Sequence, residues 1–241
     1  MTRRRLFTVT AAAAFALVGM AAGAQAAPII WDFNPFYPPY SGPNTGPVGA
    51  SSYTVDSFPA TGLLLTAAGF DVAPATFPAF GDTPHELYWK DLGVDEHGIG
   101  LVGTADNELT LDDSGIPANY IRLDLNNIYK NPAVTNAQIR VQSTTGFEKW
   151  DLYGWDGLNY FLLEAGNLDN NVFRPLPFWG TYPGYAVTTS PDPAHPENNV
   201  LVDAISAETV PAIPEPGTIA LLGGGLAMLA SRRKASRSAR K

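Results

Sequence analysis

The residues best suited to chemistry are acidic side chains gathered in one short stretch of the chain. Nineteen residues hold the following group: Asp95, Glu96, Asp106, Asn107, Glu108, Asp112 and Asp113. Calcium takes about six to eight oxygen ligands from carboxylates, amides and backbone carbonyls, which this stretch could supply. Its spacing matches neither an EF-hand loop nor a repeat-type calcium site. Two interpretations stand: one calcium site formed by Asp95, Glu96, Asp106, Asn107 and Glu108, or a solvated acidic face. No other cofactor is expected.

Aromatic residues form the second candidate group, because their flat apolar faces can stack on sugar rings. This group consists of Tyr153, Trp155, Tyr160, Trp179, Tyr182 and Tyr185. Trp179, Tyr182 and Tyr185 lie in a run with two glycines and a proline, which predicts a loop. Exposed there, these three side chains would form a glycan-binding surface. Aromatic side chains also fill the cores of β-proteins, so both interpretations remain open.

Catalytic chemistry finds little support in the sequence. Acids such as Asp151 and Asp156 could act as a glycosidase pair only if the fold set their separation. The three histidines, His85, His97 and His195, lack the spacing of metal ligands. The sequence contains no nucleophile elbow, phosphate loop or dinucleotide fingerprint. We therefore predict no catalytic residues and no enzyme, with a polysaccharide-active enzyme as the remaining alternative.

The composition excludes several classes of protein. The chain has no cysteine, which excludes a disulfide-stapled fold, a thiol nucleophile and a thiolate metal site. Residues 27–210 hold 22 of the 23 acidic residues but only six of the 15 basic ones. A surface that acidic repels nucleic acid, so nucleic-acid binding is excluded.

The first 26 residues predict a helical signal peptide. Arg3-Arg4-Arg5 forms a positively charged start, and Leu6 to Gly23 is a mostly apolar segment. Ala24-Gln25-Ala26 is a small-x-small cleavage site, so we expect export through a translocase and cleavage after Ala26. The paired arginines leave both the general secretory and the twin-arginine routes open.

The C-terminal stretch, residues 211–241, combines three features. Pro214-Glu215-Pro216 is extended, because proline lacks an amide donor and has a fixed φ. Residues 218–230 are uncharged and mostly apolar, predicting a short hydrophobic helix below the roughly 20 residues that span a bilayer comfortably. The remaining tail carries six basic residues and no acidic one, which holds it on the cytoplasmic side of a membrane.

This order of features resembles the PEP-CTERM protein-sorting signal of bacterial envelope proteins. The resemblance implies that Pro214-Glu215-Pro216 is recognised by a transpeptidase-like membrane enzyme, the exosortase. It also implies a protein delivered to the envelope or the outside of the cell, often with exopolysaccharide, after transient anchoring through residues 218–230. The basic tail is longer than is usual for this signal, and the apolar span is short.

Between the two signals, the pattern predicts one β-rich domain at residues 27–210. Short runs with one apolar face alternate with glycine and proline, and helical periodicity is nearly absent. The expected strands are 29–33, 63–66, 86–90, 98–102, 108–111, 120–125, 138–142, 150–155, 160–164, 185–189 and 200–207. Regular short strands of this kind predict two packed antiparallel sheets, and we expect a jelly-roll β-sandwich.

Two segments of this domain also resemble known proteins. Leu92-Gly93-Val94-Asp95-Glu96 followed by residues 106–111 resembles a turn, acidic loop and strand of PEP-CTERM ectodomains. Residues 147–157 resemble a later strand and turn of the same ectodomains, which are similar to carbohydrate-binding-module-like sandwiches. The sequence thus predicts a non-enzymatic structural or binding component associated with exopolysaccharide; the alternative is a calcium-dependent carbohydrate-binding module.

Overall fold

The computed structural model describes residues 27–33, 45–72, 83–91, 96–142, 147–210 and 224–225. The signal peptide, Pro214-Glu215-Pro216 and Asp95 lie outside these ranges. Ala27–Thr209 forms one compact unit, and Met1–Ala26 with Val210–Lys241 forms another. Nearly all of the described residues belong to the first unit.

Sheet 1 has eight strands among the described residues, in the order β13-β10-β15-β7-β6-β2, with β1 and β8 also paired to β15. Its strands are β1 (Ala27–Asp32), β2 (Gly46–Pro47), β6 (Leu87–Asp91), β7 (His97–Leu101), β8 (Leu109–Thr110), β10 (Val134–Gln142), β13 (Arg174–Pro175) and β15 (Asn199–Thr209). The pairings are antiparallel. The long strand β15 is the centre of this sheet.

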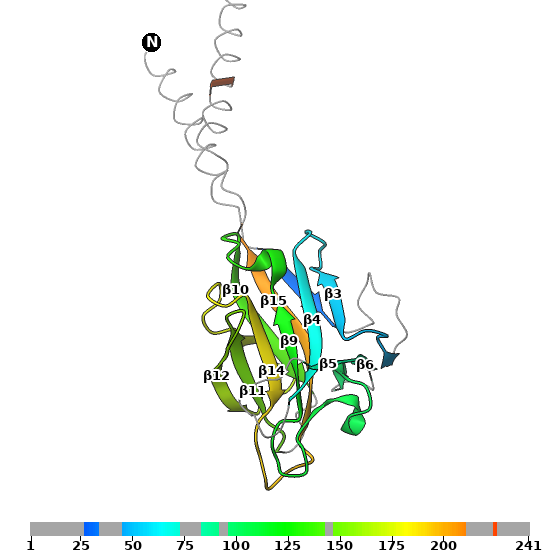
Figure 1. The fold of residues 1–241 in the computed structure, drawn as a ribbon. Helices are drawn as coiled ribbons and strands as arrows, with labels where there is room; N and C mark the ends of the chain where they lie inside the picture. The colour runs from blue at the N-terminus through cyan, green and yellow to red at the C-terminus, as the bar shows by residue number, and fades with distance from the viewer. Residues whose placement is uncertain are drawn as a thin grey trace, which may run out of the picture. The chain divides into compact units, whose positions relative to one another are not determined.

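Sheet 2 has seven strands in the described part of the chain, in the order β12-β11-β14-β9-β4-β3, with β5 paired to β4. Its strands are β3 (Ser52–Asp56), β4 (Leu64–Asp71), β5 (Thr83–His85), β9 (Asn119–Asp124), β11 (Trp150–Trp155), β12 (Tyr160–Asn167) and β14 (Gly184–Thr189). These pairings are also antiparallel. Two short 3-10 helices, η2 (Ala105–Asn107) and η3 (Asn126–Ile128), lie in connections. Figure 1 shows sheet 2 in front, with β10 and β15 behind it.

Alternation along the strands explains why the two sheets pack face to face. In β9, Ile121 and Leu123 are fully buried, whereas the intervening Arg122 and the following Asp124 are partly exposed. Successive side chains of a strand point to opposite faces, so the apolar set faces the other sheet.

Inward side chains from both sheets form one core. Trp31, Trp150 and Tyr185 are its largest members, and aliphatic residues fill the space between them. Each fully buried aliphatic or phenylalanine side chain contributes roughly 1.5–3 kcal/mol to the free energy of unfolding. This core makes the sandwich a rigid support for the residues on its outer faces.

The prediction of an all-β fold with two antiparallel sheets is confirmed. All eleven predicted strands are present, β11 with the predicted ends and the others with shifted ends, and the sequence prediction missed β2, β3, β5 and β13. The predicted terminal helices lie outside the described residues, apart from Gly224 and Gly225, which are helical. No helix within the described ranges has the length and apolar character needed to cross a membrane.

Candidate functional site

Three of the predicted calcium ligands meet in the structure, around a lysine. One carboxylate oxygen each from Glu96, Asp106 and Glu108 lies within 4.8 Å of the others. Lys90 Nζ lies among them, 3.1 Å from Glu96, 2.6 Å from Asp106 and 2.5 Å from Glu108. We call these four residues the Lys90 cage. The Lys90 ammonium group occupies the position that a bound metal cation would take between the three carboxylates.

The local sequence explains how Lys90 reaches this position. Leu87 and Trp89 of β6 face the core, so Lys90 points to the outer face of sheet 1, opposite Gly98. The segment carrying the acids packs directly on this face, because a Cβ atom at Gly100 would lie 2.0 Å from the Asn107 carbonyl oxygen. A glycine at that position therefore lets the acids approach Lys90.

The surrounding carboxylates hold Lys90 in its charged form. Burial lowers the pKa of the Lys90 ammonium, but its hydrogen bonds to Asp106 and Glu108 raise it more, so the net pKa lies above the usual value. Glu108 is fully buried. With its amide oriented to satisfy its neighbours, Asn199 donates to the second oxygen of Glu108 at 2.8 Å. Glu108 therefore has a partner for each oxygen.

Of the other two predicted ligands, one lies apart from the cage and one is outside the described residues. Asn107 turns away, and its side-chain oxygen accepts a hydrogen bond from the Gly103 amide at 3.0 Å. Asp95 lies outside the described residues. The sequence prediction did not include Lys90, which is the residue that organises the acids.

The three aromatic residues proposed for glycan binding have different environments. Tyr185 is fully buried, and its hydroxyl donates to the Pro177 carbonyl at 2.9 Å. Trp179 is half-buried and stacks on Tyr185, with ring centroids 6.4 Å apart and an interplanar angle of 9°. Tyr182 packs edge-on against Tyr185, with ring centroids 6.1 Å apart. Tyr185 is therefore a core residue that supports Trp179.

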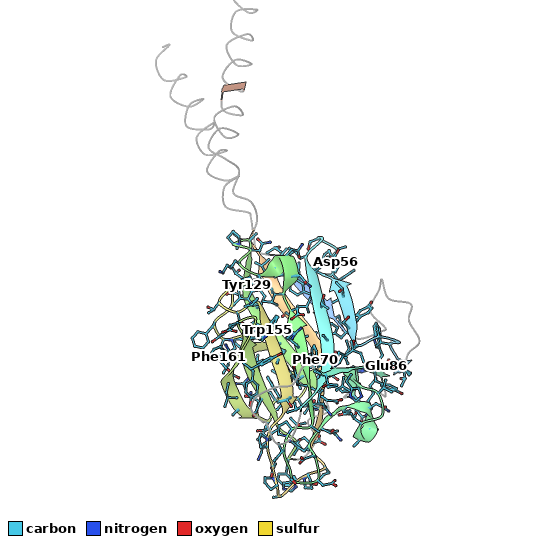
Figure 2. The ribbon with its side chains drawn as sticks, in the orientation of Figure 1. Asp56, Phe70, Glu86, Tyr129, Trp155 and Phe161 are labelled. Atoms are coloured by element: carbon cyan, nitrogen blue, oxygen red, sulfur yellow. The ribbon has the colours of Figure 1, made fainter. Side chains whose placement is uncertain are left out.

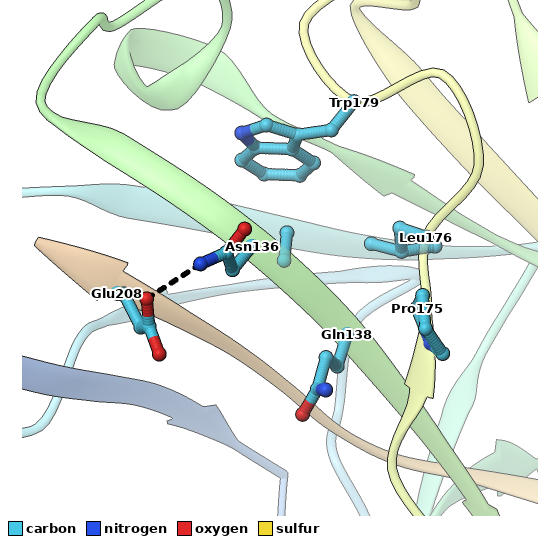
Figure 3. Close-up of a pocket in the computed structure, with 7 residues that line it drawn as sticks. Asn136, Gln138, Pro175, Leu176, Trp179 and Glu208 are labelled. Atoms are coloured by element: carbon cyan, nitrogen blue, oxygen red, sulfur yellow. Dashed lines mark hydrogen bonds between the residues drawn. The ribbon is translucent and has the colours of Figure 1, made fainter.

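Trp179 borders a cavity of about 450 Å³ at the edge of sheet 1 (Figure 3). We call it the Trp179 cavity. It is lined by Asn136, Ala137, Gln138, Pro175, Leu176, Trp179 and Glu208. Ala137, Pro175, Leu176 and the indole make one part of the lining apolar. Asn136, Gln138 and Glu208 make the rest polar.

A β-bulge shapes the polar part of the cavity. The register between β10 and β15 shifts between Thr135, which pairs with Glu208, and Gln138, which pairs with Ser206. Within the bulge Asn136 has a φ of 52°, a left-handed conformation that asparagine adopts more readily than most residues. Its amide donates to Glu208 Oε2 at 2.6 Å (Figure 3). The bulge thus directs both polar side chains toward the cavity.

The polar groups of the cavity retain unused hydrogen-bonding capacity. Gln138 Oε1 accepts one long bond, 3.5 Å from Ser206 Oγ. Within the described part of the chain, Gln138 Nε2, Asn136 Oδ1 and Glu208 Oε1 have no hydrogen-bond partner. A ligand would therefore find one donor and two acceptors here.

A second aromatic cluster lies on the outer face of sheet 2. The Arg122 guanidinium lies 4.7 Å from the Phe70 ring centroid and 4.1 Å from that of Trp155, as a cation between two π faces. Figure 2 shows both rings on the same face. Arg122 also binds Asp124 at 2.8 Å and Tyr160 at 3.3 Å. Trp155 and Tyr160 are thus engaged with Arg122.

The possible catalytic groups have structural partners. Burial raises the pKa of the Asp151 carboxyl, which also accepts a hydrogen bond from the Gly166 amide at 2.8 Å. Hydrogen bonds from the Asn159 and Leu158 amides lower the pKa of Asp156 in a tight turn. The three histidines do not form one site. His85 pairs with Asp71, His97 with Asp91 and His195 with Glu197.

Comparison with known proteins identifies the C-terminal segment. The family model of the PEP-CTERM protein-sorting motif matches residues 212–234, which contain the Pro-Glu-Pro tripeptide. No curated protein and no solved structure matches the chain.

Proposed function

We propose that this chain, which its PEP-CTERM motif marks as an exported envelope protein sorted by an exosortase, is a non-enzymatic structural or binding component associated with exopolysaccharide. The motif at residues 212–234 is the observation that carries the proposal. The acidic domain between the signals agrees with it, because a highly charged surface favours solubility outside the cell.

The tail has a transient role in this proposal. Residues 218–230 anchor the translocated chain in the membrane, and the basic residues after them stay on the cytoplasmic side. The exosortase then acts near Pro214-Glu215-Pro216 and removes the anchor. The folded unit Ala27–Thr209, whose proposed subtype is a jelly-roll sandwich, is delivered to the envelope or the matrix.

The test compares producing cells with and without their exosortase. Wild-type protein should leave the membrane fraction only when the exosortase is present. Replacing Pro214, Glu215 and Pro216 by alanine should keep the protein in the membrane, whereas Pro211→Ala, outside the tripeptide, should not. Equal release from cells lacking the exosortase would refute the proposal.

A calcium-dependent carbohydrate-binding module is the second candidate. The closeness of Glu96, Asp106 and Glu108 favours it, since three carboxylates suit calcium. The Lys90 ammonium opposes it, because calcium would have to displace an internal cation that already binds all three. A calcium-dependent rise in melting temperature that chelation reverses would support this candidate. A polysaccharide-active enzyme would have to release reducing ends from matrix polysaccharide.

A further inference from the structure

We infer that the Trp179 cavity binds a neutral saccharide unit, with the indole against an apolar face of the sugar and Asn136, Gln138 and Glu208 on its hydroxyl groups. The choice of saccharide as ligand rests on the proposed function, which places the protein beside exopolysaccharide. The position and chemistry of the cavity are independent of that choice.

The size and lining of the cavity suit a small polar ring. Its volume of about 450 Å³ lies within the roughly 300–1,000 Å³ typical of ligand pockets. A sugar presents C–H groups on one face and hydroxyls around its edge. The Trp179 indole and the apolar side chain of Leu176 match the C–H face, since aromatic rings supply flat apolar contact area.

The unused hydrogen-bonding groups match hydroxyls, which both donate and accept. Glu208 Oε1 and Asn136 Oδ1 can accept from a sugar, and Gln138 Nε2 can donate to it. The Asn136–Glu208 hydrogen bond at 2.6 Å fixes the two acceptors relative to each other. A carboxylate that accepts from a hydroxyl makes a stronger bond than a neutral acceptor.

The charge of the cavity selects among saccharides. Glu208 is the only charged side chain in the described lining, and no basic residue accompanies it. A uronate or a sulfated sugar would bring a second negative charge to an uncompensated carboxylate, in a domain that is acidic overall. The cavity therefore favours neutral sugars over anionic ones.

The cavity is held in shape by contacts that do not involve a ligand. The Trp179 indole N–H donates to the Val134 carbonyl at 3.1 Å, and Tyr185 supports one face of the ring. The preceding residue, Phe178, has a φ of 54°, which is uncommon for a bulky residue. Asn136 is the second left-handed residue at this site. The indole and the Asn136 side chain are thus held in place before any ligand binds.

The test is isothermal calorimetry on exported protein with five probes: cellohexaose, laminarihexaose, maltohexaose, the neutral polysaccharide fraction of the producing cells, and trigalacturonate. At least one neutral probe should bind, and trigalacturonate should not. Gln138→Ala and Glu208→Ala should each weaken binding about tenfold or more, because each removes a hydrogen-bonding group from the site. Glu197→Ala, an exposed carboxylate outside the lining, is the matched control and should leave affinity unchanged.

Absence of binding by all four neutral probes, preferential binding of trigalacturonate, or unchanged affinity in both cavity variants would overturn the inference. Sedimentation with isolated matrix separates this inference from the proposed function. If wild-type and both cavity variants sediment equally with matrix, the matrix role stands without the cavity, and unchanged affinity in the calorimetry then overturns the cavity inference. If wild-type protein does not sediment with matrix, the matrix role fails, and the calorimetry still decides whether the cavity binds sugar.

Discussion

The Lys90 cage and the Trp179 cavity are two polar clusters on the same sheet, and they differ in what they leave unused. In the cage a buried ammonium engages three carboxylates, and Glu108 is satisfied at each oxygen. In the cavity Glu208, Asn136 and Gln138 each keep a group without a partner among the described residues. The groups of the cage bind one another, whereas the cavity has hydrogen-bonding groups available to the ligand proposed above.

This difference shows why acid density alone is a poor guide to a binding site. In the densest acidic stretch of the sequence, Glu96, Asp106 and Glu108 already bind a lysine from another strand. Among the described residues that line the Trp179 cavity there is one acid, Glu208. Unused hydrogen-bonding capacity beside an apolar wall is the better criterion.

Removal of the internal cation should produce the largest effect. Lys90→Met leaves Glu108 buried without its charge partner, which should lower the free energy of unfolding by about 3–5 kcal/mol. Urea denaturation measures this loss. In the control, Lys149→Met breaks a more exposed pair, 3.4 Å from Asp192, and should cost about 1 kcal/mol or less. A Lys90→Met protein as stable as this control would show that Lys90 is not needed as the charge partner of the buried Glu108.

Calcium should distinguish the cage with its lysine from the cage without it. Wild-type protein should show no change in melting temperature on calcium addition or chelation, because the ammonium occupies the centre of the cage. In Lys90→Met the carboxylates become available, and calcium at five times its Kd should restore about 1 kcal/mol. A calcium-dependent rise in the wild-type melting temperature would contradict a cage already occupied by the Lys90 ammonium.

The ion pair between His85 and Asp71 is partly exposed, and its contribution to stability should depend on pH. Burial lowers the pKa of the His85 imidazole, but hydrogen bonds to Asp71 at 2.6 Å and to the Val102 carbonyl at 2.7 Å raise it more, to a net value above 6.5. A raised pKa stabilises the fold fully below pH 6.5, and this contribution disappears as the pH rises through the folded-state pKa.

Between pH 6 and pH 9 the wild type should therefore lose up to about 1 kcal/mol relative to His85→Asn, which lacks the titrating ring. Denaturation of both proteins at the two pH values gives the difference. An identical pH dependence in the two proteins would show that the charged pair contributes nothing.

The cavity variants should have the smallest effect on stability. Gln138→Ala and Glu208→Ala remove partly exposed side chains with spare hydrogen-bonding groups, so each should change the free energy of unfolding by about 0.5 kcal/mol or less. Urea denaturation measures this change, with the Lys90→Met protein as the reference for a large loss. A loss as large as that of Lys90→Met would mean that the cavity residues are structural.

Much of the fold could be predicted from local patterns. The alternation of residues 120–125 identified β9, and similar runs identified the other long strands. The missed strands include β5, a three-residue segment containing Pro84, and β13, a two-residue segment. Short strands of this kind depend on their neighbours in the sheet, and few residues are available to show a period.

The candidate site was harder to predict, because its residues come from separate parts of the chain. Trp179 could be identified because it is an aromatic residue in a run with glycines and a proline. Asn136, Gln138 and Glu208 carry no such local signal. They meet only through the bulge between β10 and β15, which is a property of strand pairing. Lys90 was missed for the same reason: its partners in the cage follow it by six to eighteen residues.

We expect the chain to be exported and processed at its PEP-CTERM tail. Mass spectrometry of the protein recovered outside the producing cells tests this expectation most directly. The expected product has an N-terminus at Ala27 and a C-terminus near Pro214-Glu215-Pro216, without residues 218–241. Extracellular protein that still ends at Lys241 would contradict this expectation.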